Sequence, residues 1–303
     1  MIQTAQLIIG HRSLFAAVVP ILLLVSLVLQ PSLIWQIIAL GSFVVLLGLP
    51  HGALDHRVAT SLWSLSTLRG HTLFFAGYIG LAVAVLTVWI IASNIALAAF
   101  LIYSAVHFSD DWRDDLGMWQ SFPLGISVIA LPSLVFQSDV AELFGFLTST
   151  QVATLFAKIM HDIAIVAIAV SAFCLVLNFR TALWVTLEYS LLVAAALVTP
   201  PLIYFVIYFC GLHSPRHFVQ TVAQLRLTPM QGLRASLPIL TATLVLTTFG
   251  AVTLTSFNST LQTTVLQIVF PGLAALTVPH MLLTAAFRSV RKEALARPCP
   301  GET

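Results

Sequence analysis

Five histidines of this 303-residue chain lie within or at the ends of long apolar segments. An ionisable side chain inside an apolar segment is costly to bury, which makes it a candidate for function. Neutral imidazole binds zinc, copper, iron and nickel, and several imidazoles together can form a metal site. The pattern therefore predicts a buried metal site, and a set of polar residues facing a water-filled cavity is the alternative. The histidines are His51, His107, His213, His217 and His280.

Two of these histidines, in the sequence GLHSPRH, are four positions apart. Residues four apart on a helix share one face, so His213 and His217 can bind one metal ion together. Pro215 lies between them and would open the helix locally, because proline lacks the backbone donor. The alternative is two polar residues facing water in a cavity, beside an Arg216 side chain directed inward.

The sequence GLPHGALDH places an acidic residue four positions after His51. We expect Asp55 to bind the second ring nitrogen of His51 and orient the ring, as carboxylates behind metal-bound histidines do. A ligand role for His51 is favoured over a polar helix end, whereas His56 is expected to lie in a polar loop. His107, in YSAVHFSDDW, follows an apolar run, and taken alone it fits a ligand and an interfacial histidine equally well.

An acidic residue lies in the middle of the apolar run WVTLEYS, where an uncompensated carboxylate is costly. This residue, Glu188, is expected to hydrogen-bond a ligand histidine from behind or, alternatively, to pair with a buried hydroxyl. Cys210 lies three positions before His213 and could face the same site. A small buried hydrophobe is the more common role for such a cysteine.

The types of candidate ligand restrict the chemistry. Hydrolysis at zinc would need a carboxylate base nearby, and only Glu188 and Asp55 are obvious candidates, whereas iron with open coordination positions suits oxygen chemistry. The 20 Phe, 6 Trp and 5 Tyr residues could line a tunnel for a long apolar substrate. Lipid-facing bulk and aromatic belts at the membrane surfaces explain most of these aromatics at least as well.

The composition indicates which elements must position these residues. The chain is 59% hydrophobic and 8% charged, whereas soluble domains are about one quarter charged. Continuous apolar runs of roughly 17–25 residues recur, the length that crosses a bilayer as a helix. We expect an all-α, polytopic transmembrane bundle of about ten spans (eight to ten), forming a single integral membrane domain over residues 1–303. The weakest segment, 138–158, is expected to lie along the membrane surface as an amphipathic helix. The expected spans are residues 14–29, 33–50, 72–92, 95–109, 122–137, 159–178, 182–198, 202–219, 235–256 and 264–287.

The distribution of basic residues orients this bundle. With ten spans, nearly all Lys and Arg residues fall on one side, and Lys158 is the exception. Such an excess marks the cytoplasmic face, so both termini are predicted to be cytoplasmic, in the inner (cell) membrane. The five histidines lie on even-numbered spans, which places the metal site near the cytoplasmic half. The net charge of +2 gives no indication of a nucleic-acid partner.

Four segments around these histidines resemble the Brp/Blh family of membrane β-carotene 15,15′-dioxygenases. They are GLPHGALDH (48–56), IYSAVHF (102–108), PPLIYFVIYFCGLHSPRHF (200–218) and GLAALTVPHMLL (272–283), and they occur in the order of the family. The resemblance covers about residues 40–285 and implies a membrane helix bundle with a non-haem Fe2+ centre. It implies that His51, His107, His213 and His217 bind the iron. His280 matches a recurrent family position whose role is less clear.

The resemblance implies central cleavage of β-carotene by O2 into two molecules of all-trans-retinal. The substrates would be β-carotene and O2, and the product would enter the membrane lipid, where a retinal protein could accept it. His280, Glu188 and Asp55 are expected to support the ligands without binding the metal. The alternatives are a membrane oxygenase or hydroxylase acting on another carotenoid or lipid, and a non-catalytic protein that binds metal or haem. A di-iron hydroxylase would need several HxxxH and HxxHH boxes, and the chain has one HxxxH.

Overall fold

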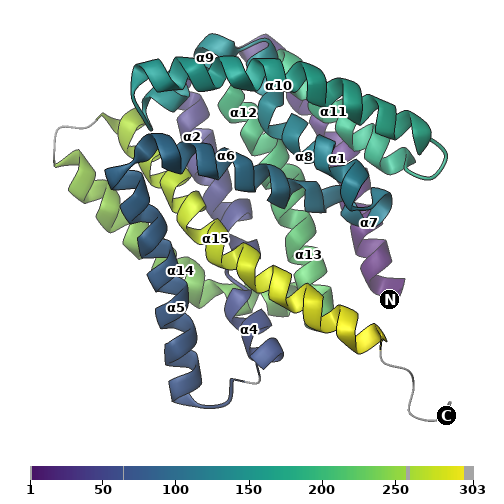
Figure 1. The fold of residues 1–303 in the computed structure, drawn as a ribbon, viewed down its shortest axis with the longest axis vertical. Helices are drawn as coiled ribbons and strands as arrows, with labels where there is room; N and C mark the ends of the chain where they lie inside the picture. The colour runs from purple at the N-terminus through teal and green to yellow at the C-terminus, as the bar shows by residue number, and fades with distance from the viewer. Residues whose placement is uncertain (1, 64, 257–259, 297–303) are drawn as a thin grey trace.

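The computed structural model describes residues 2–63, 65–256 and 260–296, and within these ranges the chain forms helices and no strand (Figure 1). This confirms the all-α prediction. Segments η1 and η4 are π-helical, and η2 and η3 are 3-10 helices. In chain order the elements are α1 (Ile2–Leu29), α2 (Leu33–Phe43), η1 (Val44–Gly48), α3 (Leu49–Gly52), α4 (Asp55–Trp63), α5 (Leu68–Ile91), α6 (Ser93–Ser109), η2 (Asp110–Trp112), α7 (Arg113–Leu116), α8 (Met118–Ala130), η3 (Leu131–Leu134), α9 (Gln137–Gly145), α10 (Thr150–Leu177), α11 (Leu183–Val198), α12 (Pro201–Phe205), η4 (Val206–His213), α13 (Ser214–Gln224), α14 (Pro229–Thr255) and α15 (Leu261–Ala296).

Fewer helices than expected have the length and composition of a membrane span. In the described chain six helices do, or up to seven if the pair 118–134 and 137–145, bent by 100°, counts as one span. The expected eight to ten spans are therefore not confirmed. The reason is that an apolar run measures composition and not helix length: α6 and α11 have 17 and 16 residues, fewer than the roughly 20 that cross a bilayer. The six are Gln6–Leu29, Leu33–Trp63, Leu68–Ile91, Thr150–Leu177, Pro229–Thr255 and Leu261–Val290.

The segment expected to lie along the membrane surface is not one helix. Residues 138–158 contain nearly all of α9 and the start of α10, with a turn between them. In Figure 1, α10 runs across the long axis of the molecule, whereas α5 runs along it. The helices α5 and α14 bury few side chains and expose large apolar ones such as Ile79, Leu246 and Phe249. Such exposed apolar surfaces are typical of lipid-facing helices, because burying an apolar side chain away from lipid gives no hydrophobic gain.

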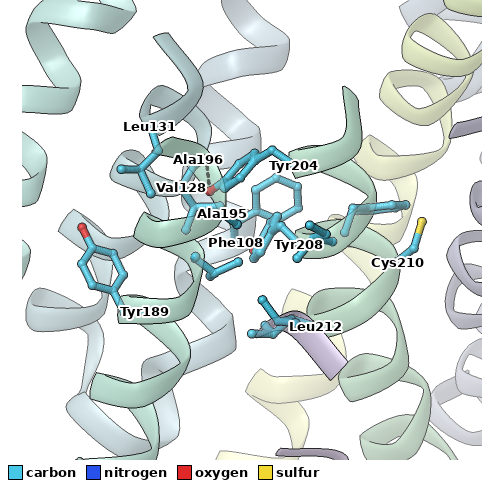
Figure 2. Close-up of a cluster of buried hydrophobic side chains, with 14 of the residues drawn as sticks. Phe108, Val128, Leu131, Tyr189, Ala195, Ala196, Tyr204, Tyr208, Cys210 and Leu212 are labelled. Carbon is cyan, nitrogen blue, oxygen red and sulfur yellow. Dashed lines mark hydrogen bonds between the residues drawn. The ribbon is translucent and has the colours of Figure 1, made fainter. Parts of the chain in front are cut away.

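The main hydrophobic core lies beside the histidine-bearing segments. Many of its residues come from α8, α11 and the continuous run α12–η4, and α1, α2, α6, α10 and α15 add others. Figure 2 shows Phe108, Tyr204, Tyr208 and Leu212 packed within it. The buried tyrosine hydroxyls of this core have partners: the Tyr204 hydroxyl, for example, donates to the Val128 carbonyl at 2.9 Å. Because buried polar groups that lack partners are costly, these bonds fix how the helices pack.

One glycine sets how closely α6 and α8 approach. A Cβ atom at Gly125 would lie 2.4 Å from the Ala105 carbonyl oxygen and 2.6 Å from the Ser109 amide nitrogen. Both neighbours are backbone atoms of α6 and cannot rotate away. Since His107 lies between them in sequence, the close contact at Gly125 also holds one of the five histidines in place.

We predict that Gly125→Ala will lower the thermal stability of the purified protein, because overpacking at a rigid backbone contact costs about 1–3 kcal/mol. Gly77→Ala is the matched control, since Gly77 lies in α5 with nothing within 4 Å of the added Cβ. Its melting temperature should stay the same or rise slightly, as alanine favours helix. Thermal melts in detergent measure both, and equal melting temperatures for the two variants would contradict the close approach.

Candidate metal centre

The structure brings the five histidines of the apolar segments into one cluster. They come from α3 (His51), α6 (His107), the end of η4 (His213), α13 (His217) and α15 (His280). Eight of the ten ring pairs in this cluster have centroids between 4.6 Å (His213 and His217) and 6.3 Å (His217 and His280) apart. Segments separated by up to 229 positions in sequence, from His51 to His280, therefore meet at one point.

The tightest group contains the HxxxH pair. One ring nitrogen each of His107, His213 and His217 lie within 4.8 Å of one another, a group that could hold a metal ion. This confirms that the four-residue spacing places His213 and His217 side by side. His51 stands beside this group, with its ring centroid 5.6 Å from that of His213 and 6.3 Å from that of His217.

A buried carboxylate anchors His213. The Nδ1 atom of His213 lies 3.1 and 3.2 Å from the two carboxylate oxygens of Asp111, and the Tyr208 hydroxyl donates to the same carboxylate at 2.7 Å. Burial raises the pKa of the Asp111 carboxyl, but the neighbouring His213, Arg216 and His217 outweigh burial and hold that pKa well below its usual range. The carboxylate is therefore charged, and it fixes the ring so that Nε2 of His213 faces away from Asp111.

A second carboxylate anchors a different histidine from the one expected. Asp55 binds Nδ1 of His280, at 2.8 and 3.0 Å, and not His51. The Nδ1 atom of His51 pairs instead with the Gly48 carbonyl one turn earlier. The expectation that Asp55 orients His51 is thus corrected: α3 ends at Gly52, and Asp55 begins the next helix, α4, which turns its first residue toward α15.

Glu188 touches none of the five histidines. It accepts hydrogen bonds from Arg216 and, at 3.1 Å, from the Trp112 indole, and it also pairs with Arg12 at 3.3 Å. Glu188 therefore binds neither of the partners expected from the sequence, a ligand histidine or a buried hydroxyl. Arg216 links it to the site, because this buried guanidinium also donates to the backbone carbonyl of Asp111 at 2.8 Å. Glu188 therefore balances the charge of Arg216 one step behind the histidines.

The ring nitrogens that lack a hydrogen-bond partner indicate whether the cluster fits a metal. In the described part of the chain, Nδ1 of His107, Nε2 of His213 and Nε2 of His280 are buried without a hydrogen-bond partner. A buried polar atom without a partner costs about 1–3 kcal/mol, so three in one place call for a ligand. A metal–nitrogen bond of about 2.1 Å puts two imidazole centroids about 4.6 Å apart at a right angle and about 6.5 Å apart when opposite. The observed 4.6–6.3 Å fits a transition metal bound by imidazole.

Three residues of the site were missed from the sequence: Asp111, Tyr208 and Tyr78. Asp111 follows His107 by four positions, the spacing of a helix face, which was a usable signal. Tyr208 and Tyr78 gave none, since their partners lie far away in the sequence: the Tyr78 hydroxyl donates to Asp55, 23 positions earlier. Cys210 lies in the core and is 1% exposed, as expected of a small buried hydrophobe.

The comparisons with known proteins point to one family. The family described as beta-carotene 15,15′-dioxygenase matches residues 42–288. A curated relative named beta-carotene 15,15′-dioxygenase, from uncultured marine bacterium 66A03, is 31% identical over 264 residues, which covers 82% of this chain and 92% of the relative. No solved structure matches the chain.

We predict that Asp111→Ala will weaken metal binding by the purified protein about 10- to 100-fold, the usual effect of losing a carboxylate behind a metal-bound histidine. Asp114→Ala is the matched control, because Asp114 is exposed in the same short segment. Titration of the metal-free protein with Co2+ gives both affinities. An affinity unchanged by Asp111→Ala would show that this anchor does not support a metal.

Proposed function

The chain belongs to the beta-carotene 15,15′-dioxygenase family, and on this premise we propose that it cleaves β-carotene at its central double bond, with O2, into two molecules of all-trans-retinal. Family membership makes it a carotenoid-cleaving dioxygenase by class. The observation that carries the rest of the proposal is the cluster of buried imidazoles whose nitrogens lack partners. We propose Fe2+ as the cofactor, held by His51, His107, His213 and His217.

The ligand set fits the chemistry of the family. When bound, iron supplies the activation of O2, and the protein contributes binding and orientation. The chain supplies neutral imidazoles and two carboxylates that do not compete for the metal, because Asp111 and Asp55 each face the Nδ1 side of a histidine. Such anchoring fixes the ring orientation and increases the basicity of the ligand nitrogen.

Aromatic side chains form an apolar wall beside the histidines. The Phe209 ring is stacked on His213 with centroids 5.6 Å apart, and the Phe108 ring stands edge-on to His213 at 4.8 Å. From Phe209 the aromatic contacts continue to Phe205 at 5.1 Å and then to Phe270 at 5.5 Å. We propose that this row of aromatic rings guides a long apolar polyene to the histidines. The rings also exclude water from the histidines, and the exclusion of water suits reactive oxygen chemistry.

We propose that the chain is a single integral membrane domain over residues 1–303, in the inner (cell) membrane. The run α12–η4–α13 (residues 201–224) exceeds the roughly 20 residues that cross a bilayer, and its histidines and Arg216 are turned toward the protein interior. If this run also crosses the membrane, the six to seven spans become seven or eight, and eight lies within the range expected from the sequence. Eight spans place both termini on one side.

Charge supports a cytoplasmic position for the metal centre. Arg12 pairs with Asp115, and Arg288 pairs with Asp110, so basic residues from both ends of the chain surround the segment that holds Asp111. Basic residues gather on the cytoplasmic side of membrane proteins. We therefore place the histidines in the cytoplasmic half. Retinal formed there would enter the lipid, where a retinal protein could accept it.

We predict that a host that accumulates β-carotene will lose colour and gain retinal when it expresses this chain. His213→Ala should abolish both effects, because it removes a ligand, whereas His56→Ala should retain them, because the His56 ring pairs only with the Ala53 carbonyl. Extracted pigments and iron per protein are measured together. Aldehydes longer or shorter than C20 would refute central cleavage, and a haem absorption band in the purified protein would refute the non-haem centre.

A reporter fused after Thr303 tests the orientation. We predict cytoplasmic activity of such a fusion, because nearly all Lys and Arg residues gather on one face and two ends separated by an even number of spans share that face. A second fusion before Met1 serves as the control and should report the same side. Periplasmic activity of either fusion would require an odd number of spans or the opposite orientation.

A further inference from the structure

We propose that His280 is a fifth metal ligand, held by a buried Tyr78–Asp55–His280 arm that matches the Tyr208–Asp111–His213 arm on the other side of the site. The inference rests on the proposed function only for the identity of the metal. It departs from the role expected from the sequence, in which His280 supports the ligands without binding the metal. Three observations carry it: the construction of the arm, the position of the ring and the state of its free nitrogen.

The two arms are built alike from unrelated segments. Asp55 lies 2.8 and 3.0 Å from Nδ1 of His280 and accepts a hydrogen bond of 2.8 Å from the Tyr78 hydroxyl. In the other arm, Asp111 lies 3.1 and 3.2 Å from Nδ1 of His213 and accepts a bond of 2.7 Å from Tyr208. Both aspartates are 5% exposed. A buried carboxylate behind an imidazole is the arrangement that prepares histidine as a metal ligand.

The ring of His280 lies as close to the other histidines as the ring of His51 does. Its centroid is 5.3 Å from that of His51, 5.5 Å from that of His107 and 6.3 Å from that of His217. The centroid of His51 is 5.6 Å from that of His213 and 6.3 Å from that of His217. Distance alone therefore gives no reason to count His51 as a ligand and to leave out His280.

The Nε2 nitrogen of His280 makes no hydrogen bond to any described residue. A neutral His280 ring with Nδ1 facing the acceptor Asp55 would carry its proton on Nδ1 and present the lone pair of Nε2 to the cluster. This Nε2 atom is buried and has no hydrogen-bond partner among the described residues, the same state as Nε2 of His213. A lone pair that is buried among other imidazoles suits a cation and is costly without one.

The arm also joins two parts of the bundle. Tyr78 lies in α5, Asp55 begins α4 and His280 lies in α15, and α4 and α5 both pack on α15. The other arm joins η2, η4 and α13. A metal bound by both arms would tie the two groups of helices together, so binding should raise the melting temperature by an amount that depends on His280.

The experiment is a Co2+ titration of the metal-free, full-length protein in detergent, followed by visible absorption and by thermal melts with and without Co2+. His280→Ala is compared with His213→Ala and with the matched control His56→Ala, whose ring is half-buried on the neighbouring helix α4 and pairs with its own turn. We expect His280→Ala to weaken Co2+ binding at least 10-fold, to change the absorption band and to reduce the rise in melting temperature. His56→Ala should leave all three unchanged.

Milder variants keep the test decisive if His280→Ala does not fold. Asp55→Asn and Asp111→Asn remove one charge each from equivalent positions, so both should weaken Co2+ binding to a similar extent, within about 10- to 100-fold. Tyr78→Phe removes only a hydroxyl and should have a smaller effect in the same direction. Co2+ affinity and absorption unchanged in His280→Ala, or in Asp55→Asn while Asp111→Asn loses binding, would overturn the fifth ligand.

Retinal formation by the Fe2+-loaded protein, measured on the same preparations, separates this inference from the proposed function. If Co2+ binding depends on His280 but no retinal forms, the proposed cleavage fails and the fifth ligand stands. If retinal forms and His280→Ala binds Co2+ as the unmodified protein does, the fifth ligand fails and the cleavage stands. A His280→Ala variant that binds Co2+ normally and forms no retinal would assign His280 a role outside the metal, which also overturns the inference.

Discussion

The site depends on one property of imidazole: a ring that offers one nitrogen to a common centre is oriented by a hydrogen bond to its other nitrogen. Three of the five clustered histidines are oriented in this way through Nδ1, with the Gly48 carbonyl behind His51, Asp111 behind His213 and Asp55 behind His280. Two of these acceptors are carboxylates buried in an apolar protein, where an uncompensated charge costs several kcal/mol. Each therefore needs partners of its own, and those partners determine much of the surrounding packing.

Compensation of the buried charges involves successive residues that lie farther and farther from the histidines. The Asp111 carboxylate accepts a hydrogen bond from Tyr208, and the Asp111 backbone carbonyl accepts one from Arg216. Arg216 in turn pairs with Glu188, and Glu188 also pairs with Arg12 of the first helix. This chain of polar contacts runs from the histidines to the basic face and links α1, η2, α11 and α13. Aromatic residues such as Phe108 and Phe209 enclose its inner end. The polar network is thus surrounded by apolar side chains at the end where it contacts the histidines.

The helical class and the five histidines of the site could be predicted from the sequence, because both follow from local patterns. Apolar runs indicate helices, and an ionisable residue inside such a run is conspicuous; the HxxxH pair follows from helix periodicity. The partners could not be found this way, since His280 and Asp55 are 225 positions apart and His213 and Asp111 are 102 apart. A rule for neighbours on one helix assigned Asp55 to His51. The expected number of spans is not confirmed, because apolar runs do not reveal where helices bend or stop.

The two π-helical segments have a consequence for how this protein can change. Val44–Gly48 ends three positions before His51, and Val206–His213 ends at a histidine. A π turn arises when one extra residue is accommodated in an α-helix, and such turns are frequent at functional sites. Tyr208 and His213 are five positions apart in the second π segment, and both bind Asp111. In an α-helix residues five apart point about 140° away from each other, whereas the wider π turn brings them to one face. The π spacing therefore allows one carboxylate to hold a tyrosine and a histidine of the same segment, and changes that return this segment to α-helical spacing would break that shared contact without replacing any contacting residue.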